Sequence, residues 1–276
     1  MVLRPLPWAR RLALPFLVVL AGLALLPAAD AARAETPERL TAQEPQLLYL
    51  PVGSTGVDIS WPQCSNGERP QGLLHFAILG VNGGKMNTKN TCLADMYRWA
   101  MGGRTIPQVY VNTNGLPADY TNKACPPKDV YCNAYYYGYE GAAMAVAYAR
   151  ASNADPRQWW LDVETANAWG TDQFANGRVL LGMVEYLQAT GHTPGVYSTP
   201  SQWGRIVGAA YAPGLPAWTA GAANLAEAMT RCTDRYAFGG GKVAMVQYIS
   251  EHFDTSYVCP GAIRTGAVIP GITASN

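Results

Sequence analysis

The chain has 276 residues, and only 14 % of them are charged, against the share of about a quarter that is usual in soluble domains. Hydrophobic residues make up 49 %, so the chain can bury a sizeable core, which excludes a disordered chain and a miniprotein held together only by disulfides. The formal net charge of +1 gives no reason to expect binding to nucleic acid.

The first 34 residues have the pattern of a secretory signal peptide. A basic start (Arg4, Arg10, Arg11) precedes an apolar stretch over 12–27 and a run of small residues up to Ala34. An uncleaved anchor is the alternative, but Pro15 interrupts the apolar stretch, which is short for a membrane span. We therefore predict a secreted or cell-envelope protein with no stable membrane span after cleavage, and a linker or N-terminal extension over 35–55.

Six cysteines in an exported chain suggest three disulfides. Pairing the cysteines that close loops within one region gives Cys64–Cys92, Cys125–Cys132 and Cys232–Cys259. Zinc is the rival explanation, but there is no Cys-x-x-Cys and the three histidines are far apart. We expect no metal and no cofactor.

Short apolar runs recur from Gly56 onward, most of them ending in a polar residue. They cover 56–60, 76–82, 106–112, 159–164, 195–198, 215–218, 243–248 and 253–254. Helix-compatible stretches at 93–101, 138–152 and 175–190 separate the earlier runs. This alternation predicts an α/β protein with parallel strands and crossover helices. We expect an irregular, TIM-like (β/α) barrel forming a single domain over 56–260, with shorter connections between the last strands and a C-terminal tail over 261–276.

Carboxylates are the leading candidates for catalysis, since the sequence has no Gly-x-Ser-x-Gly, no His-Glu-x-x-His and no phosphate-binding loop. Asp162 and Glu164 end one apolar run, and strand alternation places both on one face, about 6 to 7 Å apart. Mutual repulsion and burial can keep one protonated as a general acid while the other stays ionised. The alternative is an ion pair or a capping role at the strand end.

Asp58 ends the first run and Asp254 follows the last, so closure of a barrel would bring both toward the same rim. Either aspartate alone would be interpreted as a turn or cap residue. Aromatic residues with a polar group are abundant, with 8 Trp and 16 Tyr against 5 Phe, and such side chains suit sugar rings. A tyrosine cluster at 131–139 is compatible with either a sugar platform or a packed lid.

Several segments, taken in order, resemble glycoside hydrolase family 25, the lysozymes that cut peptidoglycan. They are Gly56-Val-Asp-Ile-Ser60, Leu161-Asp-Val-Glu164, Gly195-Val-Tyr-Ser-Thr199 with Trp203, then Trp218, Val246-Gln-Tyr248 and Asp254. The resemblance spans about 56–259 and is closest to a divergent, secreted actinobacterial type.

The resemblance implies an irregular (β/α) barrel that hydrolyses the β-1,4 bond between N-acetylmuramic acid and N-acetylglucosamine. By position Glu164 would be the proton donor, and Asp162 would stabilise charge or orient the substrate's N-acetyl group, with Asp58 and Asp254 in supporting roles. Substrate-binding residues implied in the same way are Tyr110, Asn112, Tyr197, Trp218, Gln247 and Tyr248.

The flanking motifs depart from the family pattern. The second strand is followed by Val81-Asn-Gly-Gly84 where Ala-Thr-Glu-Gly is usual, and the third ends Tyr110-Val-Asn112 where Tyr-His-Phe is usual. The last motif is Asp254-Thr-Ser256 instead of Asp-x-Asn, and the cysteines are additional. Besides a secreted peptidoglycan hydrolase, the sequence thus leaves open a non-catalytic cell-wall glycan-binding protein on a hydrolase-like barrel, or a barrel whose acids are structural.

Overall fold

The structure is a computed structural model that describes residues 50–72, 74–250 and 253–260. The predicted signal peptide, the greater part of the predicted linker and nearly all of the predicted C-terminal tail lie outside the described residues.

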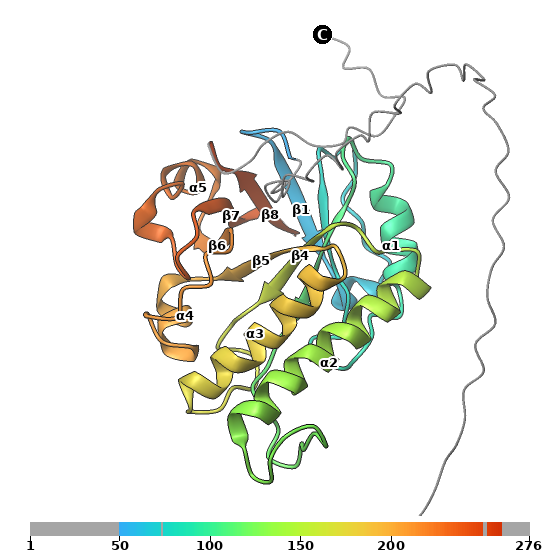
Figure 1. Cartoon of the computed structure of the whole chain (residues 1–276). Helices are drawn as coiled ribbons and strands as arrows, with labels where there is room; N and C mark the ends of the chain where they lie inside the picture. Colours follow the sequence, from blue (N-terminus) through green and yellow to red (C-terminus); the bar gives the residue numbers. More distant parts are fainter. Residues whose placement is uncertain (1–49, 73, 251–252, 261–276) are drawn as a thin grey trace, which may run out of the picture. The chain divides into compact units, whose positions relative to one another are not determined.

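Eight strands close into a barrel in chain order, which confirms the predicted fold class (Figure 1). The strands are β1 (Thr55–Ile59), β2 (Ala77–Gly80), β3 (Gln108–Asn112), β4 (Gln158–Asp162), β5 (Thr193–Ser198), β6 (Ala217–Ala222), β7 (Val243–Ser250) and β8 (Phe253–Val258). Neighbours from β1 to β7 are parallel. The irregularity expected at the last strands is the reversal of β8, which runs antiparallel to both β7 and β1. The link from Ser250 to Phe253 is too short for the crossover that a parallel strand requires.

Five α-helices and two 3-10 helices connect the described strands. They are η1 (Trp61–Cys64), α1 (Leu93–Ala100), α2 (Val130–Ala151), α3 (Gln173–Ala189), α4 (Pro200–Ile206), α5 (Leu225–Thr230) and η2 (Asp234–Tyr236). The helix expected at 138–152 begins earlier, because the Asp129 side chain accepts from the backbone N–H groups of Tyr131 and Cys132 and caps it there. The tyrosine cluster at 131–139 therefore belongs to the first turns of α2.

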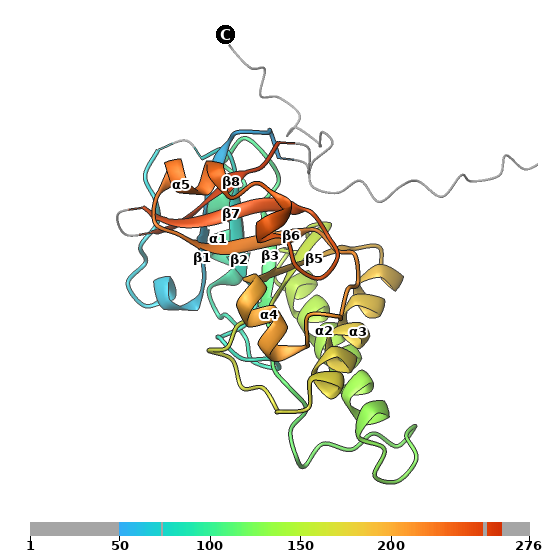
Figure 2. The same cartoon turned by 90° about the vertical axis from the view of Figure 1, so that its left-hand side faces the viewer.

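Helices α2 and α3 pack side by side outside the barrel (Figures 1 and 2). Two glycines make this close approach possible. A Cβ at Gly138 would lie 1.9 Å from the Val179 carbonyl oxygen, and one at Gly182 would lie 2.0 Å from that of Tyr135. The two backbones thus touch directly, which fixes where both helices begin relative to the barrel.

Large side chains fill the barrel interior and leave their polar groups paired. Trp160 and Trp218 are almost fully buried, with ring centroids 5.7 Å apart. The indole N–H of Trp160 donates to Gln108 Oε1 over 2.8 Å, and that of Trp218 donates to Ser256 Oγ over 2.9 Å. The interior is therefore a packed core without unpaired indole groups, and a ligand has access only at its ends.

Three disulfides join the pairs expected from loop lengths: Cys64–Cys92, Cys125–Cys132 and Cys232–Cys259. The first ties η1 to the start of α1, the second closes the loop before α2, and the third joins the residues after α5 and β8.

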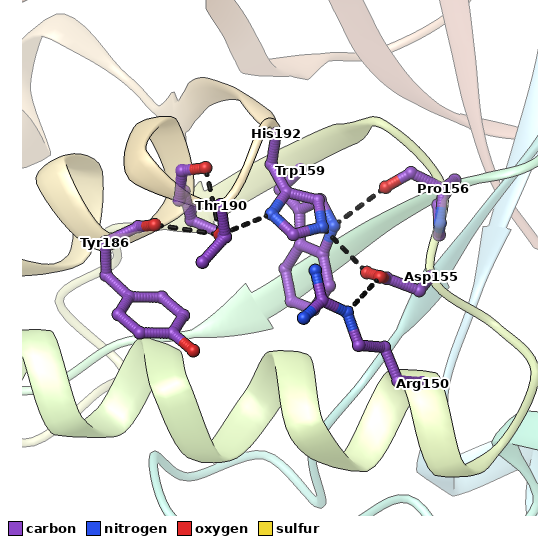
Figure 3. Close-up of polar contacts among 8 residues, drawn as sticks. Arg150, Asp155, Pro156, Trp159, Tyr186, Thr190 and His192 are labelled. Atoms are coloured by element: carbon purple, nitrogen blue, oxygen red, sulfur yellow. Dashed lines mark hydrogen bonds and ion pairs between the residues drawn. The ribbon is translucent and has the colours of Figure 1, made fainter.

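A polar cluster around the buried His192 joins the start of β4 to the turn between α3 and β5 (Figure 3). His192 Nε2 lies 2.8 Å from Asp155 Oδ1, and its Nδ1 lies 2.8 Å from Thr190 Oγ1. Arg150 donates to the other Asp155 oxygen over 2.7 Å. A hydroxyl, an imidazole and a carboxylate in line resemble a catalytic triad, but Thr190 Oγ1 already donates to the carbonyl oxygens of Tyr186 and Leu187. We interpret the cluster as structural, because its hydrogen bonds join the amino-terminal ends of β4 and β5.

Within the described ranges, no helix has both the length and the apolar character that crossing a bilayer requires.

Candidate active site

Four carboxylates lie at one end of the barrel. Two of them, Asp58 and Asp254, come from strands that run in opposite directions. Asp162 is the last residue of β4, and Glu164 follows it at the end where the parallel strands finish. Asp58 lies near the end of β1, and Asp254 lies near the start of β8. Because β8 is reversed, Asp58 and Asp254 are directly opposite each other in the β1–β8 ladder. Their side chains therefore share one face of the sheet.

Asp162 is held in one orientation by its neighbours. Its side chain is only 3 % exposed, and Oδ2 accepts from the Asn112 amide. The backbone of Asn112 is fixed in turn by the Asn82 side chain, whose Nδ2 donates to the Asn112 carbonyl and whose Oδ1 accepts from the Asn112 backbone N–H. Oδ1 of Asp162 is buried and has no hydrogen-bond partner among the described residues. A buried acceptor without a partner is available to a ligand or to a proton on the adjacent carboxyl.

Glu164 lies farther out and is half-buried. Its backbone carbonyl accepts from the Trp169 indole over 2.9 Å and from Asn167 N over 3.1 Å, which holds the turn after β4. The next residue, Thr165, donates through both its backbone N–H and its hydroxyl to Gln202 Oε1 of α4. Since these donors fix which amide atom is the oxygen, the Gln202 N–H₂ group is directed away from Thr165.

Gln247 connects the other side of the site. Its Nε2 donates to both oxygens of Asp58 over 3.1 Å, and its Oε1 accepts from the Tyr197 hydroxyl over 2.7 Å. Gln247, on β7, thereby links β1 to β5 across the barrel end.

All four carboxyl groups are harder to ionise than usual. Burial raises the pKa of Asp58 to about 8, and the facing Asp254 carboxylate adds to the rise. Burial, followed by the charge of Glu164, raises the pKa of Asp162 above its ordinary range. Burial also raises the pKa values of Glu164 and Asp254, while a hydrogen bond from Gln202 partly lowers that of Glu164. Raised pKa values favour the protonated forms of these groups, and general acid catalysis requires a protonated carboxyl group.

Aromatic rings form the inner wall below the carboxylates. Trp218 makes edge contacts with Tyr197, at 4.5 Å between centroids, and with Tyr110, at 6.3 Å. Tyr110 and Asn112 are two residues apart in β3 and share its inward face, as the strand period requires.

Of the residues predicted to form the site, Tyr248 lies elsewhere. It follows Gln247 in β7, so its side chain points to the opposite face of the strand, where it packs with Val246, Tyr257 and Cys259. Two adjacent strand residues cannot both face the barrel interior, which argues against a place for Tyr248 among the substrate-binding side chains. The remaining predicted residues are brought together as described above.

Sequence reasoning missed three polar residues that support the site: Asn82, Gln202 and Ser256. Asn82 sits just after β2, at the same rim as Asn112, so its position at a strand end was a usable signal. Gln202 comes from a short helix that the sequence pattern did not predict. Ser256 is fully buried and meets the Trp218 indole across the barrel, which only the reversed β8 makes possible.

Metal binding at this rim is not indicated: the described residues contain no group of three or more His, Cys, Asp or Glu side chains placed to hold an ion.

Comparisons with known proteins give sequence similarity over part of the chain. Residues 128–248 match the family model described as Lysozyme-like protein 1 (Lys-1). Over 112 residues the chain is 36 % identical to a probable GH family 25 lysozyme 4 of Dictyostelium discoideum, a match that covers 40 % of this chain and 49 % of that protein. The chain thus spans about half the length of this curated relative.

Solved structures with a similar chain trace include a multimodular pneumococcal cell wall endolysin from phage Cp-1. It is 17 % identical with a TM-score of 0.48, over 76 % of this chain and 55 % of that one. A family GH25 lysozyme from Aspergillus fumigatus is 13 % identical with a TM-score of 0.45, over 76 % of this chain and 96 % of that one.

Proposed function

We propose that this chain, which is similar over part of its length to a lysozyme-like family model and to a probable GH family 25 lysozyme, is a glycosidase that cleaves β-1,4 bonds of peptidoglycan. The single observation that carries the proposal is the cluster of four carboxyl groups with raised pKa values at one barrel end. A non-catalytic glycan-binding protein has no evident need to gather four acids at one rim, one of them buried and two half-buried, since their repulsion destabilises the fold.

In this proposal Glu164 donates the proton to the glycosidic oxygen. It is the more exposed member of the pair with Asp162, so a substrate can reach it, and burial raises its pKa toward the working range of a general acid. Asp162 is buried, and the hydrogen bond from Asn112 fixes its position beside Glu164. It would stabilise the positive charge that develops on the sugar or orient the N-acetyl group.

Asp58 and Asp254 take supporting roles. With its pKa near 8, Asp58 is protonated at neutral pH and can donate a hydrogen bond to a sugar oxygen. Tyr110, Tyr197 and Trp218 provide the apolar face beside it. The predicted signal peptide and the three disulfides support export to an oxidising compartment, where peptidoglycan is accessible.

The test is digestion of purified peptidoglycan by the oxidised protein, with mass analysis of the soluble fragments. We expect fragments with a reducing muramic acid end, and at least a thousandfold slower release by Glu164→Gln because the proton donor is lost. The matched control is Glu68→Gln, an exposed glutamate outside the site. If Glu164→Gln retains activity, the assignment is wrong; if the wild type binds wall material but releases nothing, the glycan-binding alternative replaces it.

A further inference from the structure

A cavity of about 490 Å³ lies between two loops that lead away from the carboxylate rim. Its walls come from the loop between β3 and α2, the loop between β4 and α3, and the first turns of both helices. These loops begin at the site itself: Asn112 and Asp162 end β3 and β4, and the cavity wall begins at Leu116 on one loop and Gly170 on the other. Trp169, whose indole donates to the Glu164 carbonyl, directly precedes Gly170.

The two loops are held together where they leave the site. Gly115 N donates to the Ala168 carbonyl over 2.8 Å, and a Cβ at Gly115 would lie 2.8 Å from Gly170 N. On the outer side, two links fix the loop to α2: the disulfide Cys125–Cys132 and a hydrogen bond from the Tyr120 hydroxyl to Glu140, 2.7 Å long. The cavity is therefore preformed, which lowers the entropic cost of binding.

The cavity wall is mainly apolar, with Leu116, Pro117, Val130 and Ala175 among its members. Its two buried amides are already engaged. Asn133 donates to the Asp129 carbonyl and accepts from Asn122 N, while Asn176 donates to the carbonyls of Gly170 and Ile206. The buried amides are thus not free to bind a sugar ring, and the remaining polar side chains of the wall include Thr121, Thr171 and Lys128.

The cavity wall contains one positively charged and one negatively charged side chain. Lys128 is exposed, with a left-handed backbone at φ 65°, and Asp172 caps α3 by accepting from Ala175 N. A ligand with small aliphatic side chains, amide groups and both carboxylate and ammonium charges fits this combination. That is the chemistry of a short peptide, such as the one peptidoglycan carries on its muramic acid.

We propose that this cavity is a subsite for the peptide portion of peptidoglycan, placed beside the bond-cleaving carboxylates. The inference rests on the proposed function, because it takes the glycan held at the carboxylates to be the carrier of the peptide. Lys128 binds a peptide carboxylate, and the wall around Leu116 and Val130 accepts the aliphatic side chains.

The experiment compares glycan strands that carry their peptides with strands stripped by an amidase. On peptide-bearing strands, Lys128→Asn and Ala118→Trp should each raise KM about tenfold, the first by removing a charge-assisted bond and the second by filling the cavity from an exposed lining position. Asparagine tolerates the left-handed backbone, so this change is chosen to spare the fold. On stripped strands, both variants should match the wild type.

Matched controls come from the same loop. Lys123→Asn and Ala124→Trp alter exposed positions outside the cavity and should leave KM unchanged on both substrates. Equal KM values for wild type and cavity variants on peptide-bearing strands would overturn the subsite, as would equal losses on stripped strands, which would mean that the cavity holds sugar.

A binding measurement separates this inference from the proposed function. Calorimetry with the Glu164→Gln protein and the muramic acid disaccharide, with and without its peptide, requires no turnover. Tighter binding of the peptide-bearing form, lost in the additional Lys128→Asn variant, supports the subsite even if the wild type cleaves nothing. Equal affinity for the disaccharide with and without its peptide would overturn the peptide subsite. The proposed cleavage activity would be unaffected by that result.

Discussion

Single side chains at the barrel end act through the residues that hold them. Glu164 is the clearest case, because the pKa of its carboxyl depends on four neighbouring side chains: Gln202, Asp254, Asp162 and Tyr197. Gln202 also accepts both Thr165 donors, so one amide orients the turn and affects the acid. The working pH of Glu164 is therefore adjustable from α4 without touching a carboxylate.

Replacing Gln202 with leucine tests this dependence. The hydrogen bond from Gln202 lowers the pKa of Glu164, so its removal raises that pKa further. A general acid works while protonated, so the alkaline limb of the kcat/KM profile should move upward by about 0.5 to 1 pH unit. The measurement is the pH profile of peptidoglycan hydrolysis.

Gln188→Leu, an exposed change on α3, serves as the comparison and should leave the profile in place. A lower rate with an unmoved alkaline limb for Gln202→Leu would mean that Gln202 only supports the turn through Thr165.

At the scale of elements, the α2–α3 pair depends on backbone contact at two glycines. Gly182→Ala would force a Cβ against the Tyr135 carbonyl, so the helices must separate. We expect the free energy of unfolding to fall by about 1 to 3 kcal/mol, as for other overpacked sites. Denaturant unfolding followed by circular dichroism measures this.

Gly204→Ala provides the contrast, since a Cβ at this position in α4 would meet nothing within 4 Å. It should be neutral or slightly stabilising, because alanine restricts the unfolded chain and suits a helix. If both substitutions had the same effect, close helix contact would not explain Gly182.

Much of the element order could be predicted from the sequence, for reasons that differ between elements. Apolar runs such as 159–164 mark strands strongly, because a strand covered on both faces is apolar throughout. The start of α2 was missed because its first turns are tyrosines, whose periodicity is weak, and the cap at Asp129 was the better signal. Helices α4 and α5 are too short to show a period, although Thr199 and Asn224 cap them.

The site could be predicted in part, since acids at strand ends meet at one rim of a barrel. The resemblance to glycoside hydrolase family 25 seen in the ordered motifs agrees with the similarity to a lysozyme-like family model over 128–248 and to a probable GH family 25 lysozyme over 112 residues. The reversal of β8 could not be predicted from alternation alone, and Tyr248 was included although its neighbour Gln247 requires it to face outward.

At the scale of the whole barrel, the acid cluster makes the stability of the fold depend on pH. Its contribution to the free energy of unfolding falls as the pH rises, whereas acids paired with a cation stabilise a fold more at higher pH. Asp58 has its pKa raised from 3.8 to about 8 in the folded state, so the folded chain holds a proton that the unfolded chain releases. Stability contributed by this group is therefore highest below about pH 4 and declines as the pH rises to about 8.

Asp58→Asn should remove this decline, because asparagine resembles the protonated acid and still accepts a bond from Gln247. We expect Tm to rise by about 2 to 4 °C at pH 9 and to change little at pH 4. Thermal unfolding at both pH values, with exposed Asp119→Asn as the reference, measures the difference. Equal changes at the two pH values would contradict the linkage. If Asp58→Asn stabilises the protein but slows cleavage, Asp58 is a residue that serves function at a cost in stability.

The antiparallel β8 also determines where the protein can be coupled to a solid support without covering the carboxylate rim. Thr55 pairs with Tyr257, and Gly53 N donates to the Val258 carbonyl over 3.0 Å, so the chain enters and leaves the barrel at neighbouring points. Both points lie at the end of β1 away from Asp58. A bead or a surface coupled at residues 50 or 260 would leave the carboxylate rim facing outward, and joining these points by a short bridge would permit circular permutation with new termini in a surface loop.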